Sequence, residues 1–231
     1  MKTTRSLLII ISILSFSAVS MAQDAKPKGA APIPVEVFFG NHRFATQVTV
    51  NRKFSENTKF GVFASTMTAG DYDNKLNFKN QTDRENNDSE SMNSLYLTYD
   101  VYQGLGLLAG AGINSSWGFR PFVGGRYGYR YRVLSVNMST GFYLTQSNNS
   151  ESKVAVQLTP QLSDDWSLFT GVQSMYNHNM DTKKHDRGAV YARLGLGYKA
   201  YSFGFAANLD WYGPNKVLKE NYGLYLSYAF K

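Results

Sequence analysis

The last eleven residues of the chain place large apolar side chains at every second position. This segment reads N-Y-G-L-Y-L-S-Y-A-F-K, with Asn221, Gly223, Ser227 and Ala229 between the large residues. The alternating large residues are Tyr222, Leu224, Leu226, Tyr228 and Phe230. A period of two is that of a β-strand with one apolar face. The segment is therefore expected to be a β-strand.

The same alternation recurs through most of the chain and predicts about twelve strands, of the 9–11 residue length that a tilted membrane strand needs. The predicted strands before the last are 35–39, 44–54, 60–68, 95–101, 105–113, 123–131, 134–144, 154–158, 166–176, 190–198 and 201–211. Pro32 and Pro34 flank the first strand and limit how early it can pair. Ten strands therefore remain an alternative.

The connections between the predicted strands alternate in length. Short turns separate longer, polar segments at 70–90, 114–119, 146–150, 177–187 and 213–219. Bacterial membrane barrels have short periplasmic turns and longer external loops. With both termini on the periplasmic side, the number of strands must be even.

A helical membrane protein is excluded by the hydropathy pattern. After the N-terminal segment, no stretch reaches the 18 apolar residues of a membrane helix, and no long segment has a period of 3.6. The chain has 16 tyrosines, 15 phenylalanines and 20 glycines, which is typical of one repetitive β unit. The predicted fold class is all-β: a transmembrane antiparallel up-and-down β-barrel. A soluble β-sandwich is the alternative.

The positions of the charges favour the membrane barrel. Within the strands, charged residues avoid the phase of the large apolar residues, and a lysine or arginine facing lipid at mid-depth would cost about 2–4 kcal/mol. The charges are therefore expected to face the lumen. This predicted lumen cluster is Glu36, Asp100, Arg120, Arg126, Arg130, Lys153, Arg193, Lys199 and Asp210.

Aromatic residues gather at the predicted strand ends, as amphipathic rings do at a lipid–water boundary. They are Tyr99, Tyr102, Tyr129, Tyr131, Tyr143, Trp166, Tyr198, Tyr201, Trp211 and Tyr212. Because an unpaired sheet edge is untenable in hydrocarbon, the sheet is expected to close into a ring.

The N-terminus predicts export from the cytoplasm. Residues 1–22 combine basic Lys2 and Arg5, a short apolar run and a small-x-small cleavage site, which is the pattern of a signal peptide. Residues 23–33 are a Pro/Ala/Lys-rich periplasmic tether, and residues 34–231 form the barrel. The absence of cysteine excludes disulfides and thiolate metal sites. A net charge of +7, of which Lys2 and Arg5 supply two, is too mild to indicate a nucleic-acid partner.

The closing strand resembles that of bacterial outer-membrane β-barrels, which ends on an aromatic residue; here Lys231 follows Phe230. The whole mature chain resembles, in pattern, the uncharacterised small porin-like barrels of Gram-negative outer membranes. The resemblance implies an outer-membrane location, contact with outer-membrane lipid, and recognition of the closing strand by the assembly machinery.

Two functions remain open. The first is a narrow pore or transport barrel for small solutes, in which a basic lumen would favour anions or acidic solutes. The second is a closed structural or adhesive barrel with surface-exposed loops, in which the lumen charges pair and fill the interior. The sequence does not name a solute.

Catalytic and metal sites are not expected. Outer-membrane lipases, proteases and lipid A deacylase place acid–base pairs at the rim or the lipid face, but no G-x-S-x-G motif is present here. His178 with Ser147 is a conceivable pair, and His178, Asp181, His185 and Asp186 match no zinc spacing. Gly104 to Gly112 is glycine-rich strand rather than a nucleotide motif. The prediction is a protein that is not an enzyme and has no metal or cofactor.

Overall fold

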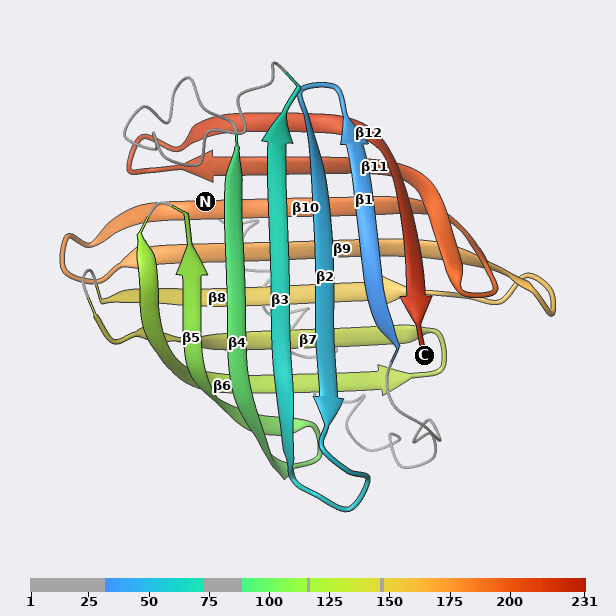
Figure 1. The fold of residues 1–231 in the computed structure, drawn as a ribbon, viewed down its shortest axis with the longest axis horizontal. Helices are drawn as coiled ribbons and strands as arrows, with labels where there is room; N and C mark the ends of the chain where they lie inside the picture. Colours follow the sequence, from blue (N-terminus) through green and yellow to red (C-terminus); the bar gives the residue numbers. More distant parts are fainter. Residues whose placement is uncertain (1–31, 73–88, 116, 146–147) are drawn as a thin grey trace, which may run out of the picture.

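The described residues form a single closed ring of antiparallel strands (Figure 1). The computed structural model describes residues 32–72, 89–115, 117–145 and 148–231. These residues form twelve strands: β1 Ile33–Gly40, β2 Arg43–Lys53, β3 Phe60–Asp71, β4 Glu90–Tyr102, β5 Leu105–Asn114, β6 Gly118–Tyr131, β7 Leu134–Tyr143, β8 Asn149–Leu158, β9 Trp166–Asn179, β10 Lys184–Tyr198, β11 Tyr201–Tyr212 and β12 Val217–Phe230. Each strand pairs with its neighbours in sequence, and β12 pairs with β1. The predicted barrel of twelve strands is confirmed.

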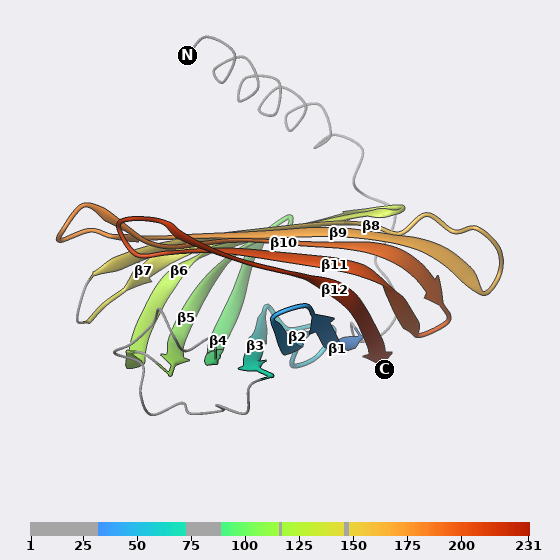
Figure 2. The same ribbon diagram turned by 90° about the horizontal axis from the view of Figure 1, so that it is seen from above.

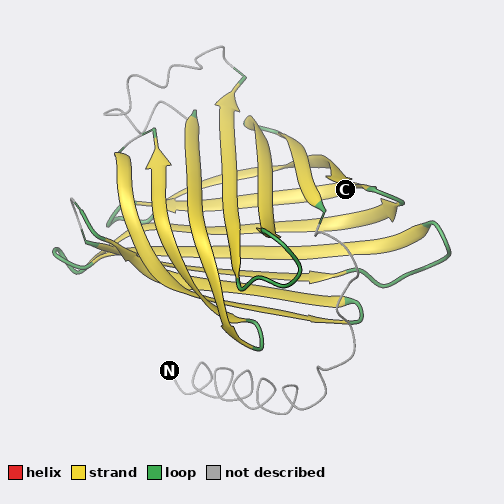
Figure 3. Cartoon of the chain, turned by 60° about the horizontal axis from the view of Figure 1, so that its bottom comes forward, coloured by secondary structure: helices red, strands yellow, loops and turns green. Residues whose placement is uncertain are grey.

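The ring has two distinct ends. Ile33 and Phe230 are paired at one end, which we call the terminal end, and the turn between β1 and β2 lies at the opposite, distal end. Figure 1 shows strands β1 to β5 running across strands β7 to β11 of the opposite wall, as expected for tilted strands, while β6 bends from one direction into the other (Figures 1 and 3). A view turned by 90° shows β8 to β12 as a gently curved wall over β1 to β6 (Figure 2). In the described part of the chain no helix is long and apolar enough to cross a membrane.

Several predicted boundaries are wrong because the strands continue into polar sequence. The predicted loop 177–187 is a four-residue turn, since β9 ends at Asn179 and β10 begins at Lys184. The predicted loop 213–219 shortens because β12 begins at Val217, and β6 begins at Gly118 inside the predicted loop 114–119. A ladder can extend past the lipid into water, where polar side chains do not end a strand. The predicted signal peptide, most of the tether and residues 73–88 of the predicted loop 70–90 lie outside the described residues.

The two prolines near the N-terminus shape the seam between β1 and β2. β1 begins at Ile33, inside the predicted tether, and pairs with β12 along its whole length. It pairs with β2 only from Val35 to Phe39. Asn41 donates its backbone N–H to Tyr222 of β12, so the even-numbered residues direct their backbone nitrogens toward β2. Pro34 has no N–H to donate there, and the ladder with β2 ends one residue later.

The outer face of the ring is apolar. Large hydrophobic side chains stand exposed on every strand except β2, as on the mid-strand positions Leu194 (55% exposed) and Phe205 (71% exposed). Four of the five predicted closing-strand residues are about half exposed on this face, and Tyr228 is less exposed: Tyr222, Leu224, Leu226, Tyr228 and Phe230. An apolar surface that runs around the whole molecule is far larger than water-soluble monomers expose. The outer wall therefore faces hydrocarbon.

The inner face carries small, polar and some aromatic residues. Phe38, Tyr225 and the flanking alanines form one buried cluster, and Tyr96, Leu108 and Phe122 form another with Tyr143. Tyr143 and Tyr212 were predicted in the lipid-boundary belt, but both point into the lumen, because they share the phase of inner residues on their strands. The inward Tyr225 breaks the simple alternation of the closing strand.

Candidate functional site

Eight of the nine residues of the predicted lumen cluster lie on the inner phase of their strands. They are Glu36, Asp100, Arg120, Arg126, Arg130, Lys153, Arg193 and Asp210. Lys199 is the exception and the prediction is wrong there. It lies in the turn between β10 and β11 with a φ of 53°, and its side chain is exposed to solvent. The alternation of β10 ends at Tyr198, so Lys199 belongs to neither face. A hydrogen bond with Tyr198 and the charge of Asp165 raise the pKa of Lys199.

An ion pair crosses the lumen near its distal end. Arg187 of β10 binds Glu90 of β4 with both guanidinium nitrogens, Nη1 to Oε2 at 2.7 Å and Nη2 to Oε1 at 2.9 Å. Strands β4 and β10 are six places apart in the ring of twelve and so lie on opposite walls. The Tyr212 hydroxyl donates to the same carboxylate at 2.9 Å, and Arg43 Nη1 donates at 3.2 Å. These side chains span the interior from wall to wall.

A second carboxylate, Asp210, holds the same two arginines on their own side of the barrel. Arg43 Nη2 donates to Asp210 Oδ2 at 2.6 Å, and Arg187 Nη2 donates to Asp210 Oδ1 at 2.8 Å. The Tyr191 hydroxyl completes the site at 2.8 Å. Asp210 is 0% exposed, and its charge is met by donors from β2 and β10. We call Arg43, Glu90, Arg187 and Asp210 the distal network; its two positive and two negative charges cancel, as buried charges require.

Sequence reasoning did not find three members of the distal network. Glu90 and Arg187 fall inside the predicted loops 70–90 and 177–187, and Arg43 falls between a predicted turn and a predicted strand. The signal that could have identified Glu90 and Arg187 is their position in the alternation of inward and outward residues. Glu90 has the parity of Asp100 on β4, and Arg187 has the parity of Arg193 on β10, so extending the alternation would have placed both on the inner wall.

Closer to the terminal end, Arg193 and Glu36 form another inner-wall pair. Arg193 Nη2 lies 2.7 Å from Glu36 Oε1, and its Nε donates to the same oxygen at 3.0 Å. Arg193 Nη1 donates to Asn208 at 2.8 Å, and the guanidinium lies 5.1 Å from the Phe38 ring centre. This pair is fixed to the wall and does not span the lumen.

The predicted charges on β8 and on the distal part of β6 belong to a further inner cluster. Lys153 lies 2.8 Å from the buried Glu151, which also accepts hydrogen bonds from Tyr143 and Asn177. Arg120 stacks on Trp117, with 4.1 Å between its guanidinium and the ring centre. The distal part of the interior thus contains a second set of paired side chains.

The terminal end is wetter. Asp100 pairs with Arg126 at 2.6 Å and with Lys53 at 2.7 Å, and Arg126 also donates to Asn51 at 2.9 Å. Lys53 is 48% exposed. Other inward polar residues toward this end are exposed too: Asn51, Arg130, Asn137 and Gln173. We call this charged, water-accessible part of the lumen the vestibule.

The histidines do not assemble a metal site. The described residues contain no group of three or more His, Cys, Asp or Glu side chains that could hold a metal ion. His185 Nδ1 lies 2.8 Å from the Gly213 carbonyl oxygen, and Asp186 accepts a hydrogen bond from Asn149. Ser147, the conceivable partner of His178, lies outside the described residues.

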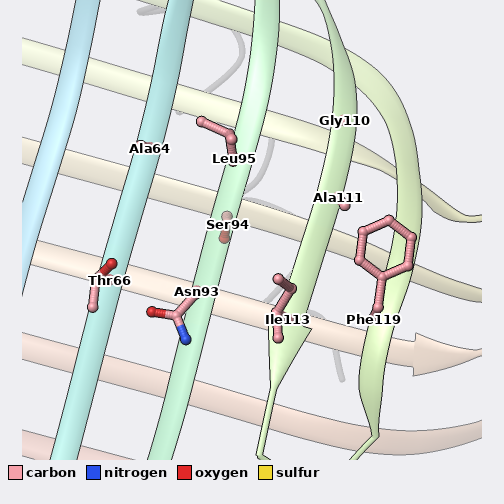
Figure 4. A pocket seen from close by; sticks show the side chains of 9 residues that line it. All are labelled: Ala64, Thr66, Asn93, Ser94, Leu95, Gly110, Ala111, Ile113 and Phe119. Carbon is pink, nitrogen blue, oxygen red and sulfur yellow. The ribbon is translucent and has the colours of Figure 1, made fainter.

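A groove of about 580 Å³ lies on the outer wall over β3 to β6 (Figure 4). Figure 4 shows Leu95 of β4 between Ala64 of β3 and Gly110 of β5, with Ile113 and Phe119 also lining the groove. Because this groove is on the lipid-facing side, it is separate from the lumen and is no part of a path for solutes.

Comparison with known proteins yields similarities of fold. No protein-family model matches the chain, and no curated protein matches it. Among solved structures, the chain is similar to a KdgM porin at 12% identity, covering 87% of this chain and 99% of that one with a TM-score of 0.46. A NanC porin matches at 13% identity over 87% and 99%, with a TM-score of 0.43. LpxR from Salmonella typhimurium matches at 9% identity over 87% and 100%, with a TM-score of 0.40. The chain itself is a closed, antiparallel, twelve-stranded β-barrel with an apolar outer wall and a charged lumen.

Proposed function

We propose that the protein is a narrow pore of the outer membrane that lets small solutes cross. The observation that carries the proposal is the division between its faces. A closed ring turns an apolar wall outward and a charged wall inward, and the inner wall is water-accessible in the vestibule. In a closed, plugged barrel the inward charges would all be buried and paired. Here Lys53 and Arg130 face inward and are exposed to water, as expected for a pore. The predicted signal peptide and closing strand support the outer-membrane location.

The vestibule supports a modest preference for anions. Among the described residues, Lys53 and Arg126 both pair with Asp100, and Arg130 is exposed on the same inner wall, so this part of the lumen has an excess of positive charge. Rings of side-chain charge set the ion preference of wide and narrow pores alike. Small hydrophilic solutes with negative charge are the class that such a vestibule would admit most readily.

Recording from refolded protein in planar bilayers tests the pore. A steady single-channel current is expected, with a reversal potential in a salt gradient that indicates anion preference. Replacing both vestibule arginines with glutamine (R126Q and R130Q) should reduce that preference and leave the barrel folded. The matched control is R132Q, in the turn that follows β6, which should change neither property. Silence across many insertions of folded protein would overturn the proposal.

A closed structural or adhesive barrel is the second candidate, and the distal network favours it. Glu90 and Arg187 span the lumen, and the side chains around them are buried. A barrel of this second kind would conduct no ions and would release no trapped small solute from vesicles. The same bilayer recording therefore separates the two candidates.

The proposal includes no catalytic role. It is supported by the lack of a G-x-S-x-G motif and by the use of the lumen carboxylates in ion pairs. Detergent-solubilised protein is expected to release no fatty acid from phospholipid and to cleave no basic peptide. Either activity, lost on replacement of His178, would contradict this part of the proposal.

A further inference from the structure

Glu90 lies on the opposite wall of the barrel from Arg187, its bidentate partner in the distal network. Arg43, Arg187 and Asp210 come from β2, β10 and β11, and the two arginines both bind Asp210 directly. Glu90 comes from β4 on the opposite wall and receives Arg187, Arg43 and Tyr212 across the interior. Without the Glu90 carboxylate, Asp210 would still hold both arginines against their own wall.

We infer that Glu90 is a latch that closes the distal end of the lumen and sets the ion preference there, an inference that rests on the proposed pore. The carboxylate draws Arg187 toward β4, and the bidentate contact fixes both side chains in the middle of the passage. When the carboxylate is removed, Arg187 retains Asp210 and Tyr191 as partners on its own side. The passage beside β4 is then free of the spanning ion pair.

The same change alters the charge of the constriction. With Glu90 the distal network holds two arginines and two carboxylates, a net charge of zero. Without it, the distal network would hold two arginines and one carboxylate, a net charge of +1. A positive constriction in a narrow passage favours anions. Loss of Glu90 therefore has two consequences, a wider passage and a stronger preference for anions, that a purely structural ion pair would not produce together.

Planar-bilayer recording of Glu90→Gln tests both consequences. Glutamine keeps the shape of the side chain and removes its charge, so conductance is expected to rise at least about twofold and the reversal potential to shift toward anions. The matched control is Glu220→Gln, the same chemical change on the outer face of β12, where the side chain is exposed. The control should leave both properties unchanged.

Thiol labelling gives a readout that does not depend on conduction. The chain contains no cysteine, so Ala189→Cys introduces a single thiol. Ala189 is inward-facing on β10, two residues from Arg187, and 4% exposed. In detergent, a charged methanethiosulfonate reagent should modify this thiol slowly in the parent and about tenfold faster with Glu90→Gln, a factor worth about 1.4 kcal/mol. Labelling with Glu220→Gln should match the parent.

A second variant, Glu90→Asp, keeps the inference testable if Glu90→Gln does not fold. Every labelled protein must first show the SDS-resistant, heat-modifiable band of a folded barrel. If Glu90→Gln does not fold, Glu90→Asp keeps the charge and withdraws it from Arg187 by one methylene. This variant should raise conductance and labelling without shifting the ion preference.

The outcomes separate the latch from the pore. Conducting parent protein, with Glu90 variants that match Glu220→Gln in current and labelling, overturns the latch and leaves the pore standing. Faster labelling in the Glu90 variants with no current from any protein overturns the pore and the ion preference assigned to Glu90, and supports only the closure of the distal end. Larger current together with faster labelling supports both.

Discussion

Asn221 holds the turn between β1 and β2 from the neighbouring strand. Its Oδ1 accepts the backbone N–H groups of His42 at 3.0 Å and Arg43 at 3.3 Å, and its Nδ2 donates to the Arg43 carbonyl at 2.9 Å. A Cβ at Gly40 would overlap this side chain, so the glycine provides the space that the amide occupies. By fixing the backbone of Arg43, Asn221 also positions one of the arginines of the distal network.

Replacing Asn221 with alanine should therefore destabilise the folded barrel. Two backbone donors and one acceptor would lose a buried partner, at a cost of about 1–3 kcal/mol. The free energy of unfolding in urea, measured in lipid vesicles, checks this expectation. Asn215→Ala, in the exposed turn between β11 and β12, is the control and should have little effect. Equal stability of the two variants would refute the role given to Asn221.

Individual lumen residues could be predicted only where a strand had been recognised. Asp100, Arg126, Arg193 and Asp210 alternate with large apolar residues, and parity placed them on the inner wall. Glu90 and Arg187 sit in polar sequence at strand ends, where no apolar phase is present to compare them with. Which charges pair could not be predicted at all, because contacts across the lumen depend on the diameter of the ring and on the register of opposite strands.

Among the elements, three strand pairs meet through glycines that lie directly opposite each other. Gly40 pairs with Gly223, Gly124 with Gly141, and Gly195 with Gly204. At each pair, an added Cβ would overlap backbone or side-chain atoms of the neighbouring strand. The backbones therefore approach too closely for a side chain at these inward positions, and glycine permits the wall to bend there.

Gly223→Ala should weaken the seam between β1 and β12. The new Cβ would overlap the Phe39 carbonyl oxygen, and relieving the overlap is expected to cost about 1–3 kcal/mol. Gly125→Ala is the control, because its Cβ would lie 3.8 Å from the nearest atom, the Gly106 carbonyl oxygen. The fraction of heat-modifiable, folded protein after refolding measures the difference. Refolding of Gly223→Ala at the level of the control would contradict a tight seam.

The strands themselves were largely predictable, because a period of two persists wherever one face meets lipid and the other does not. The positions at which the strands end were less predictable. β9 and β10 extend past the predicted boundaries into Asn, His, Asp and Lys residues, since hydrogen bonding between strands continues where both faces meet water. The single bulge in the pairing of β9 with β10, between His185 and Arg187, could not be read from alternation.

At the scale of the whole molecule, the outer wall determines where the barrel can exist. Leu194, Phe205 and Leu224 are each more than half exposed on different strands, and the apolar surface continues around the ring. Such a surface is stable against lipid tails or detergent and not against water. The charges are sheltered inside the same ring, so the fold and its location depend on the same distribution of residues.

A lysine on this wall should cost more at mid-depth than at the rim. Leu194→Lys, in the middle of β10, is expected to lower the free energy of unfolding in vesicles by about 2–4 kcal/mol. Leu218→Lys, at the second residue of β12, should cost about 0–1 kcal/mol, because it can reach water. Both positions face outward and are about half exposed. Similar costs for the two variants would show that the wall is not surrounded by lipid.

The seam between the first and last strands also constrains how the polypeptide can be made. His42 and Asn221, which meet across this seam, are 179 residues apart in sequence. A sheet of eleven strands without β12 would have two unpaired edges in hydrocarbon, where their backbone N–H and C=O groups would find no hydrogen-bond partners. Synthesis delivers β1 long before β12, so the chain must be kept from inserting alone into the membrane until β12 has been made.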